Sequence, residues 1–533
     1  MDGTLLMDES RLRSKKDLIK RRKYVALQKR QRSDNNESIL EQVQNENKRK
    51  KLTELNELTT YENNNNDNNT DDNESIEIIN TDSRVSTADA EDITYNEVQS
   101  ILGVNYTIPN SIKEEIIELF ESFPNLNKIY EIYSKIGEGT FSSVYLGKER
   151  KVSRFNNNHD NKRNKTSSLV ALKKIYVTSS PQRIFNELNL LYILRGNENV
   201  APLLDVLRYE DQVIAVLPYY KHSDFRDFYR DLPLIGIKNY MFDLFQAIEF
   251  IHKHDVIHRD IKPTNFLYNP FTGKGVLVDF GLAEKYEPVI NNACPCINGG
   301  FNDEEISKFE KLSVYPKNGY LKDDQRPGRR ANRAGTRGFR APEVLFKCNC
   351  QTPLIDIWSA GVMLLTLLSR RFPFFNSTDD IEAIMELINI YGTIEMKECA
   401  NLHGLNLDCN IPKMKNKISF SAIIANSILM DCKEGDTFAE DSPAWEILSV
   451  IDKRGRIIDN KLGNEYNNAI DLLEKSMELY SNKRENAENL LKHEFFKEFR
   501  TEVEEEDEEG YANDDDDDDD DDSDVTNDEN NTP

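Results

Sequence analysis

The segment from His258 to Asn265 combines residue types that could transfer a phosphoryl group. A carboxylate at Asp260 is followed two residues later by Lys262 and five residues later by Asn265, and a second carboxylate, Asp279, follows a short apolar strand segment. A carboxylate can orient an attacking hydroxyl and accept its proton. The spacing predicts ATP-dependent transfer, with Asp260 as the catalytic base and Lys262 balancing the charge of the transferred group. Asn265 and Asp279 are the expected Mg²⁺ ligands, since oxygen ligands suit this cation.

A glycine-rich turn earlier in the chain suits phosphate binding. Residues 137–144 read Gly-Glu-Gly-Thr-Phe-Ser-Ser-Val, and glycine lets backbone amides approach phosphate oxygens. Lys173 ends the apolar segment Val170-Ala-Leu-Lys, where an unpaired ammonium would be costly. Glu187, fourteen residues on, is its expected partner, and the pair would position the α- and β-phosphates of ATP.

Each of these features also has an ordinary structural explanation. The glycines could form a turn, Lys173 could extend from its strand to solvent, and Asp260 could cap a loop. The segments Gly335-Thr336 and Ala341-Pro342-Glu343 follow in the order that the catalytic explanation requires. Because independent coincidences multiply, the whole series favours catalysis.

The elements that must position these residues change from strands to helices along the chain. Residues 108–129 are expected to form a helix and a lead-in, and Tyr130 to Val144 reads as strand, turn and strand. Ser180-Pro181 predicts the start of a helix, because proline is favoured at the first helical position. Val213 to Leu217 is a predicted buried strand, and after Tyr220 the pattern is mainly helical.

The composition indicates a folded region with disordered ends. Residues 1–107 form a basic, Asn-rich arm, and residues 501–533 hold 19 Asp and Glu residues without Lys or Arg. That tail accounts for most of the net charge of −26. Such segments bury too little apolar surface to offset chain entropy. Polar segments at about 149–168, 285–330 and 400–465 are predicted to be insertions, at least partly mobile.

The sequence shows no sign of export or membrane insertion. It has no run of about 18 apolar residues and its N-terminus is polar, so neither a membrane span nor a signal peptide is expected. Seven cysteines fit reduced intracellular thiols better than a disulfide framework. Basic runs at residues 15–32 and 48–51 suit nuclear import, with a solvated polar arm as an equal alternative.

Residues 130–500 resemble the eukaryotic serine/threonine protein kinases. The segment Asp356-Ile-Trp-Ser-Ala-Gly and Arg484 match further markers of that family. The resemblance implies an α+β, two-lobed protein kinase fold with kinase inserts and disordered tails. The N-lobe, about 130–217, would hold a small antiparallel sheet and one regulatory helix, and the larger C-lobe, about 221–500, would be mainly helical. Arg484 would pair with Glu343.

A narrower resemblance is to the catalytic subunits of fungal DDK, the cell-division-cycle kinase that fires replication origins. It is carried by segments 136–144, 171–183 and 331–340 and by the long insertion between Asp279 and Glu343. It implies activation by a Dbf-type regulatory subunit on the small lobe, acidic substrates such as MCM helicase subunits, and a nuclear role in DNA replication. Direct nucleic-acid binding is not expected. The resemblance does not extend to the arm or the tail.

The resemblance also assigns individual roles. Lys262 and Thr336 would contact Asp260 and favour serine or threonine as the acceptor. The adenine edge would hydrogen-bond the Pro218 carbonyl and the Tyr220 amide, since proline has no N–H. The catalytic set is Asp260, Lys262, Lys173 and Thr336. The ATP-binding set is Ile136, Gly137, Glu138, Gly139, Thr140, Phe141, Ser142, Val144, Ala171, Lys173, Glu187, Leu217, Pro218, Tyr219 and Tyr220.

Two alternatives stay open at this point. A pseudokinase acting as a binding module would typically lack Lys173, Asp260 or Asp279, and all three are present. An acidophilic or cyclin-dependent type of kinase from another pathway is the second alternative. Arg337 and Arg340 argue against a proline-directed kinase, because their charge would crowd the substrate pocket.

An arginine cluster precedes Ala341, and it predicts preference for acidic substrates. Its members are Arg326, Arg329, Arg330, Arg333, Arg337 and Arg340. Guanidinium groups pair with carboxylate or phosphate, so Arg337 and Arg340 are expected to bind an acidic or phosphorylated residue just after the target serine. The Asp514–Asp522 run and Ser523 could compete weakly for this site, or the tail could serve only for solubility.

Two cysteine pairs raise the question of zinc. Cys294-Pro-Cys296 and Cys348-Asn-Cys350 could supply four thiolates. The C-x-C spacing is tighter than the usual zinc pattern, however, and Cys348 is expected to start a structured element of the helical lobe. Free buried thiols are therefore the expectation.

Overall fold

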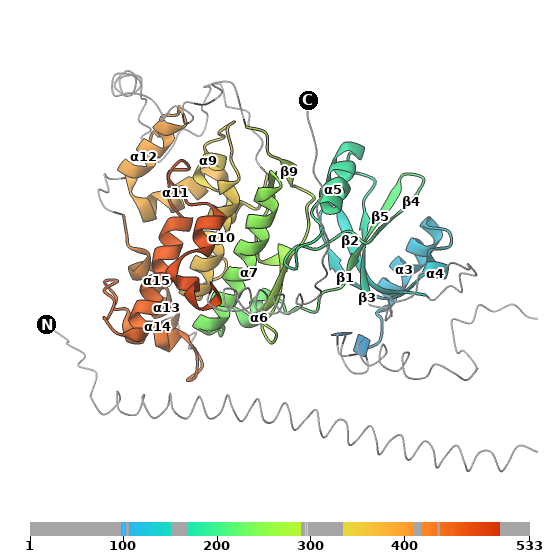
Figure 1. Cartoon of the computed structure of the whole chain (residues 1–533), viewed down its shortest axis with the longest axis horizontal. Helices are drawn as coiled ribbons and strands as arrows, with labels where there is room; N and C mark the ends of the chain where they lie inside the picture. The colour runs from blue at the N-terminus through green and yellow to red at the C-terminus, as the bar shows by residue number, and fades with distance from the viewer. Residues whose placement is uncertain are drawn as a thin grey trace, which may run out of the picture. The chain divides into compact units, whose positions relative to one another are not determined.

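The computed structural model describes a strand-rich part followed by a helical part (Figure 1). The described residues are 98–99, 101–102, 106–150, 169–288, 294, 296, 334–409, 411, 417–433 and 438–500. The acidic tail, most of the basic arm and most of the expected insertions at 149–168 and 285–330 lie outside them. None of the helices in these residues is both long and apolar enough to span a bilayer.

Five antiparallel strands form the sheet of the N-lobe, in the order β1-β2-β3-β5-β4. They are β1 (Tyr130–Glu138), β2 (Ser142–Glu149), β3 (Leu169–Ile175), β4 (Asp205–Tyr209) and β5 (Gln212–Pro218). Successive side chains of a strand point to opposite faces, and β5 is buried on both. Ile214 and Val216 pack with residues of α3 (Asn110–Ser122), whereas Ala215 and Leu217 join the core that includes α5 (Pro181–Ile193).

Helix α5 begins where the sequence predicts. Ser180 caps it by accepting a hydrogen bond from the Arg183 amide at 3.4 Å, and Pro181 occupies the first helical position. Helices α3 and α4 (Leu126–Ile129) fall in the expected segment 108–129. Order begins earlier than expected, however: residues 98–99 and 101–102 are helical, and Val98 is buried with Leu146 and Leu169. The expected disordered arm therefore ends before residue 107, because these apolar side chains cover the sheet.

The helical lobe is built around α10 (Leu354–Ser369), in which every residue from Ile355 to Ser369 is buried. A helix that is apolar all round belongs in a core. The surrounding helices are α6 (Phe225–Phe228), α7 (Leu234–Lys253), α9 (Pro342–Leu345), α11 (Asp380–Tyr391), α12 (Thr393–Leu402), α13 (Phe420–Lys433), α14 (Ala444–Val450), α15 (Lys461–Ser476) and α16 (Ala487–Leu491). Three short 3₁₀ helices are η1 (Pro263–Asn265), η3 (Arg337–Phe339) and η4 (Glu494–Phe496).

The segment 400–465, which was predicted to be an insertion, is helical over much of its length. Helices α13 and α14 and the first turns of α15 lie there, and they belong to the core of the helical lobe. Phe420, Ile424 and Ile428 are fully buried at helical spacing. The periodicity looked weak because these short helices are separated by polar turns and α13 buries residues on more than one side. Residues 410, 412–416 and 434–437 are outside the described part.

Two small sheets frame the loop that carries Asp260. Strand β6 (Val256–Ile257) pairs with β9 (Glu284–Lys285), and β7 (Phe266–Asn269) pairs with β8 (Lys274–Leu277). The loop 258–265 is thus held by a strand at each end. Val278, next to Asp279, donates its amide to the Asn265 carbonyl at 2.9 Å, so the two predicted metal ligands lie on neighbouring segments.

Candidate active site

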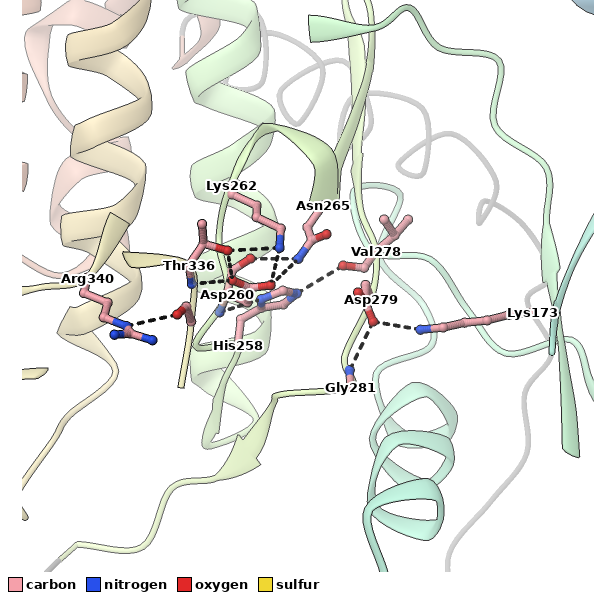
Figure 2. A network of polar contacts seen from close by, with 11 residues as sticks. Lys173, His258, Asp260, Lys262, Asn265, Val278, Asp279, Gly281, Thr336 and Arg340 are labelled. Atoms are coloured by element: carbon pink, nitrogen blue, oxygen red, sulfur yellow. Dashed lines mark hydrogen bonds and ion pairs between the residues drawn. The ribbon is translucent and has the colours of Figure 1, made fainter. Parts of the chain in front are cut away.

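Asp260 lies at the centre of a polar network (Figure 2). Its Oδ1 accepts hydrogen bonds from the amide and the hydroxyl of Thr336, both at 2.8 Å. Its Oδ2 accepts from Lys262 Nζ at 2.7 Å and Asn265 Nδ2 at 3.1 Å. Lys262 Nζ also donates to Thr336 Oγ1 at 3.0 Å. Three residues singled out in the sequence therefore converge on the Asp260 carboxylate, and Asp260 is only 8% exposed.

The close approach of Thr336 depends on the glycine before it. Gly335 has a φ of +94°, and a Cβ there would lie 2.4 Å from the Arg259 carbonyl oxygen. A side chain would both strain the backbone and collide with the catalytic loop. Gly335 therefore lets the segment before Ala341 lie directly against Asp260.

Asp356, near the start of α10, fixes the backbone of the catalytic loop. Its Oδ2 accepts from the His258 amide and its Oδ1 from the Arg259 amide, both at 2.8 Å, and His252 Nε2 lies 3.0 Å from Oδ2. Arg259 has a φ of +69°, which a non-glycine residue keeps only where its surroundings impose it. In the sequence, Asp356 stands out only as part of a segment that marks the family. The signal for its role was a carboxylate in an otherwise apolar helix.

His258 connects the catalytic loop to the segment before Asp279. Its Nδ1 accepts a hydrogen bond from the Asp260 amide at 3.3 Å, and its Nε2 lies 3.2 Å from the Val278 carbonyl oxygen. Since Nδ1 accepts, Nε2 is the nitrogen that carries the proton. The ring is fully buried, so His258 has a structural role.

Lys173 bridges two carboxylates. Its Nζ lies 2.6 Å from Oε1 of Glu187 on α5 and 2.7 Å from Oδ1 of Asp279. Burial alone would lower the pKa of Lys173, but the two carboxylates raise it above its ordinary value. Burial would likewise raise the pKa of Asp279, but Lys173 lowers it to about 2. Lys173 and Asp279 are therefore both charged at neutral pH.

Two side chains of α5 that the sequence analysis did not single out fasten this helix to the segment after β8. Arg183 Nε donates to the Gly281 carbonyl at 2.8 Å, and Asn186 Nδ2 donates to the Ala283 carbonyl at 2.9 Å. The Arg183 guanidinium also lies 3.8 Å from the centroid of the Phe141 ring. Arg183 thus joins the glycine-rich turn, α5 and the segment that carries Asp279.

The predicted ATP-binding residues lie along one series of strands. The end of β1 carries Ile136, Gly137 and Glu138, the turn that follows is formed by Gly139, Thr140 and Phe141, and β2 carries Ser142 and Val144. Strand β3 carries Ala171 and Lys173, and helix α5 carries Glu187. Strand β5 ends at Leu217 and Pro218, which are followed by Tyr219 and Tyr220. The turn is closed by a hydrogen bond from the Gly139 amide to the Ser142 carbonyl at 2.8 Å. Ala171 pairs in register with Leu217. The Tyr219 amide donates to the Leu169 carbonyl at 3.2 Å, so this amide is directed at β3.

The two arginines proposed for substrate binding both approach Asp380 at the start of α11. Arg340 Nη1 lies 2.8 Å and Arg337 Nε 3.7 Å from Asp380 Oδ1. The Arg337 side chain is 39% exposed and that of Arg340 17%. Asp380 does not stand out in the sequence, and its carboxylate pairs with part of the positive charge that was predicted to bind substrate. Arg326, Arg329, Arg330 and Arg333 lie outside the described residues.

The ion pair expected between Arg484 and Glu343 is present. Nη1 and Nη2 of Arg484 contact Oε1 and Oε2 of Glu343 at 2.7 and 3.1 Å, and both side chains are buried. Burial would raise the pKa of Glu343, but Arg484 lowers it below its ordinary value. A bidentate pair of this kind ties α9, just after the segment that carries Thr336, to the end of the helical lobe.

Comparisons with known proteins agree with this geometry. A model of the protein kinase domain matches residues 130–306 and 319–496. The chain is 41% identical over 437 residues to the cell cycle serine/threonine-protein kinase hsk1 of Schizosaccharomyces pombe, covering 78% of this chain and 82% of that protein. It is 39% identical over 405 residues to the cell cycle protein kinase spo4 of the same yeast, covering 72% and 89%. It is 30% identical over 421 residues to the cell division cycle 7-related protein kinase of Mus musculus, covering 56% and 73%.

Proposed function

Because the chain belongs to the protein kinase family, and within it to the serine/threonine cell cycle kinases of the hsk1 and cell division cycle 7 type, we propose that Asp260 accepts the proton of a protein hydroxyl during phosphoryl transfer from ATP. The observation that carries this proposal is the network around Asp260. Four hydrogen bonds fix both of its oxygens, so the carboxylate is oriented before a substrate arrives.

The neighbouring residues suit the remaining steps. Lys262 lies beside Asp260 and would balance charge on the transferred phosphoryl group, while Lys173 would neutralise the α- and β-phosphates. The amide nitrogen of Asn265 is engaged by Asp260, which leaves its oxygen as the metal-facing atom. With Asp279 it forms an oxygen donor set that suits Mg²⁺. When bound, Mg²⁺ neutralises charge on the β- and γ-phosphates.

The direct test is Asp260→Asn. We expect the variant to lose about 1,000-fold or more in kcat for a serine peptide, because the amide cannot accept the hydroxyl proton. The variant should still bind a fluorescent ATP analogue and keep its circular dichroism spectrum, since the side-chain shape is retained. Asp211→Asn, in the exposed turn between β4 and β5, is the matched control. Activity near the wild-type level in Asp260→Asn would instead favour a different base.

We further propose that the substrates are acidic and that the enzyme acts in the nucleus on MCM helicase subunits at the initiation of DNA replication. The support is the resemblance to DDK catalytic subunits together with the exposed part of Arg337, which lies one residue after Thr336. A residue that follows the target serine would meet this guanidinium before that of Arg340, which is closer to Asp380.

Paired peptides test this preference. A peptide with Asp directly after the serine should give a kcat/KM about tenfold or more above the same peptide with Lys, because the acidic side chain pairs with Arg337. Arg337→Gln should reduce the ratio of kcat/KM for the Asp peptide to kcat/KM for the Lys peptide. Arg195 is an exposed arginine after α5, and Arg195→Gln should leave this ratio unchanged. Equal rates for the two peptides would rule out an acidophilic site at this position.

A further inference from the structure

Arg337 and Arg340 share one carboxylate of the helical lobe. Asp380, the first residue of α11, places its Oδ1 2.8 Å from Arg340 Nη1 and 3.7 Å from Arg337 Nε. The side chain of Asp380 is 15% exposed and that of Arg340 17%, so water and salt screen their charges only in part. Two guanidinium groups and one carboxylate leave one net positive charge at this point of the surface.

Backbone contacts fix both guanidinium groups in place. Arg340 Nε donates to the Gly335 carbonyl at 3.0 Å (Figure 2), and Arg337 Nη1 donates to the Ser377 carbonyl at 3.2 Å. Arg340 is thus held between Gly335 and Asp380, whereas the side chain of Arg337 is the more exposed of the two. A substrate anion that pairs with Arg337 would therefore also come close to Asp380.

The position of Thr336 indicates which substrate residue carries this anion. The hydroxyl of Thr336 donates to Asp260 Oδ1 at 2.8 Å, and Asp260 is the proposed acceptor of the substrate proton. The target serine would therefore lie beside Thr336, and the next substrate residue is one Cα–Cα step of about 3.8 Å away. Because Arg337 directly follows Thr336, the residue after the target serine is the one that would meet Arg337.

Two other carboxylates of α11 bond to the loop before this helix. Glu382 Oε2 accepts hydrogen bonds from the amide and the hydroxyl of Thr378 at 2.8 and 2.7 Å. Glu386 Oε1 accepts from the Asn376 amide at 3.0 Å. Of these three carboxylates, Asp380 is the one that contacts both arginines.

We propose that Asp380 is a specificity-determining residue, because it holds the site for the residue after the target serine at one net positive charge. This inference rests on the proposed function, in which Arg337 meets that residue. An aspartate in the substrate brings one negative charge and balances the site, whereas a phosphoserine brings nearly two and is repelled more strongly by Asp380. Asp380 thus limits the advantage of a phosphorylated residue over a carboxylate at this position.

Two peptides test the proposal, one with Asp and one with phosphoserine directly after the target serine. The measured quantity is kcat/KM for the phosphoserine peptide divided by kcat/KM for the Asp peptide. Asp380→Asn should raise this quotient about fivefold, because the loss of one negative charge favours a doubly charged group more than a singly charged one. Asparagine keeps the shape and the oxygen that accepts from Arg340. A general loss of activity cancels in the quotient.

Two further variants separate charge from structure. Asp380→Glu keeps the charge, so its quotient should stay within about twofold of wild type. Asp379→Asn is the matched control, since Asp379 caps α11 by accepting hydrogen bonds from the Ile381 and Glu382 amides. Asparagine caps a helix about as well as aspartate, so this quotient should also change by less than about twofold.

A binding measurement serves if Asp380→Asn has too little activity. The same peptides with alanine in place of the target serine, followed by fluorescence anisotropy, should show a gain of about fivefold in binding of phosphoserine relative to Asp. Asp380→Ser also removes the charge and suits a helix start, so it replaces the asparagine variant if that protein is insoluble.

The outcomes distinguish this inference from the proposed function. An unchanged quotient in Asp380→Asn would overturn the role of Asp380, while the acidic preference would stand as long as the wild type prefers Asp to Lys after the serine. A wild type without that preference would overturn both.

Discussion

At the scale of single residues, the geometry of the active site depends on hydrogen bonds that fix the orientation of the Asp260 carboxylate. Thr336 supplies two of the four hydrogen bonds to Asp260 and also accepts one from Lys262. Its hydroxyl thus links the catalytic base to the lysine that would balance phosphoryl charge. Because Thr336 comes from a segment 76 positions away, the order of that segment and the orientation of Asp260 are coupled.

Thr336→Val should therefore reduce kcat with little effect on stability. The substitution keeps the shape and the backbone amide but removes one hydrogen bond to a charged group, worth about 1.5–3 kcal/mol. We expect a fall of about 10- to 100-fold in kcat, measured with saturating ATP and peptide. Thr336→Ser retains the hydroxyl and should stay within about threefold of wild type. If valine and serine variants behaved alike, the hydroxyl would have no part in orienting Asp260.

At the scale of elements, buried polar contacts fix how α7 packs on the small sheet that leads to Asp279. Asp243 on α7 accepts a hydrogen bond from the Gly275 amide of β8 at 2.7 Å and is 6% exposed. Burial raises its pKa from 3.8 to about 6, even though the Gly275 amide favours the charged form. The contact therefore carries a desolvation cost whenever the carboxylate is ionised.

The sign of the pH dependence follows from this raised pKa. Between about pH 4 and pH 6 the folded state holds a proton on Asp243 that the unfolded state has lost, so this group lowers the free energy of unfolding as pH rises. Asp243→Asn removes the titration. The free energy of unfolding of the variant, relative to wild type, should increase by about 2 kcal/mol between about pH 4 and pH 7, measured by urea unfolding. Asp211→Asn, in the exposed turn between β4 and β5, is the control. If the difference in free energy of unfolding between Asp243→Asn and wild type stayed constant across this pH range, the pKa of Asp243 would not be raised in the folded state.

At the scale of the whole molecule, the surface of α5 and the turn before it carries apolar side chains. Phe185 is 65% exposed, Tyr192 57% and Val177 54%. Large exposed apolar residues that lie near one another commonly mark a protein interface. The inward-facing side of the same helix carries Glu187, and Arg183 and Asn186 fasten it to the segment after β8. A subunit bound there could therefore act on the catalytic residues, in line with the Dbf-type regulatory subunit on the small lobe that the resemblance to DDK catalytic subunits implies.

Phe185→Asp should weaken activation by such a subunit. Burying a carboxylate in an apolar interface is costly, so we expect the subunit concentration for half-maximal activity to rise about 30-fold or more. The unstimulated rate should not change, because the side chain points away from the catalytic residues. Phe271→Asp, at a phenylalanine of the β7–β8 hairpin that is 91% exposed, should behave as wild type. An unchanged activation curve for Phe185→Asp would place the subunit elsewhere.

The sequence by itself determined the catalytic constellation and the succession of strands and helices. Asp260, Lys262 and Asn265 are set by spacing within one loop, and the start of α5 is set by Ser180 and Pro181. These are local features, because a few neighbouring residues fix the backbone and the direction of the side chains. The resemblance to protein kinases rested on the same short segments, and it correctly implied the pairing of Arg484 with Glu343.

Only the tertiary structure decided which distant groups meet. Asp356 holds a loop about 100 positions away, Asp380 approaches Arg340 from α11, and His403 joins cysteines that it does not adjoin in the sequence. The helices within 400–465 were missed for a related reason, since their apolar residues match the surrounding core rather than one amphipathic face. Contacts of this kind depend on how whole elements pack. The periodicity of the local sequence indicates helices and strands but not which distant residues come into contact.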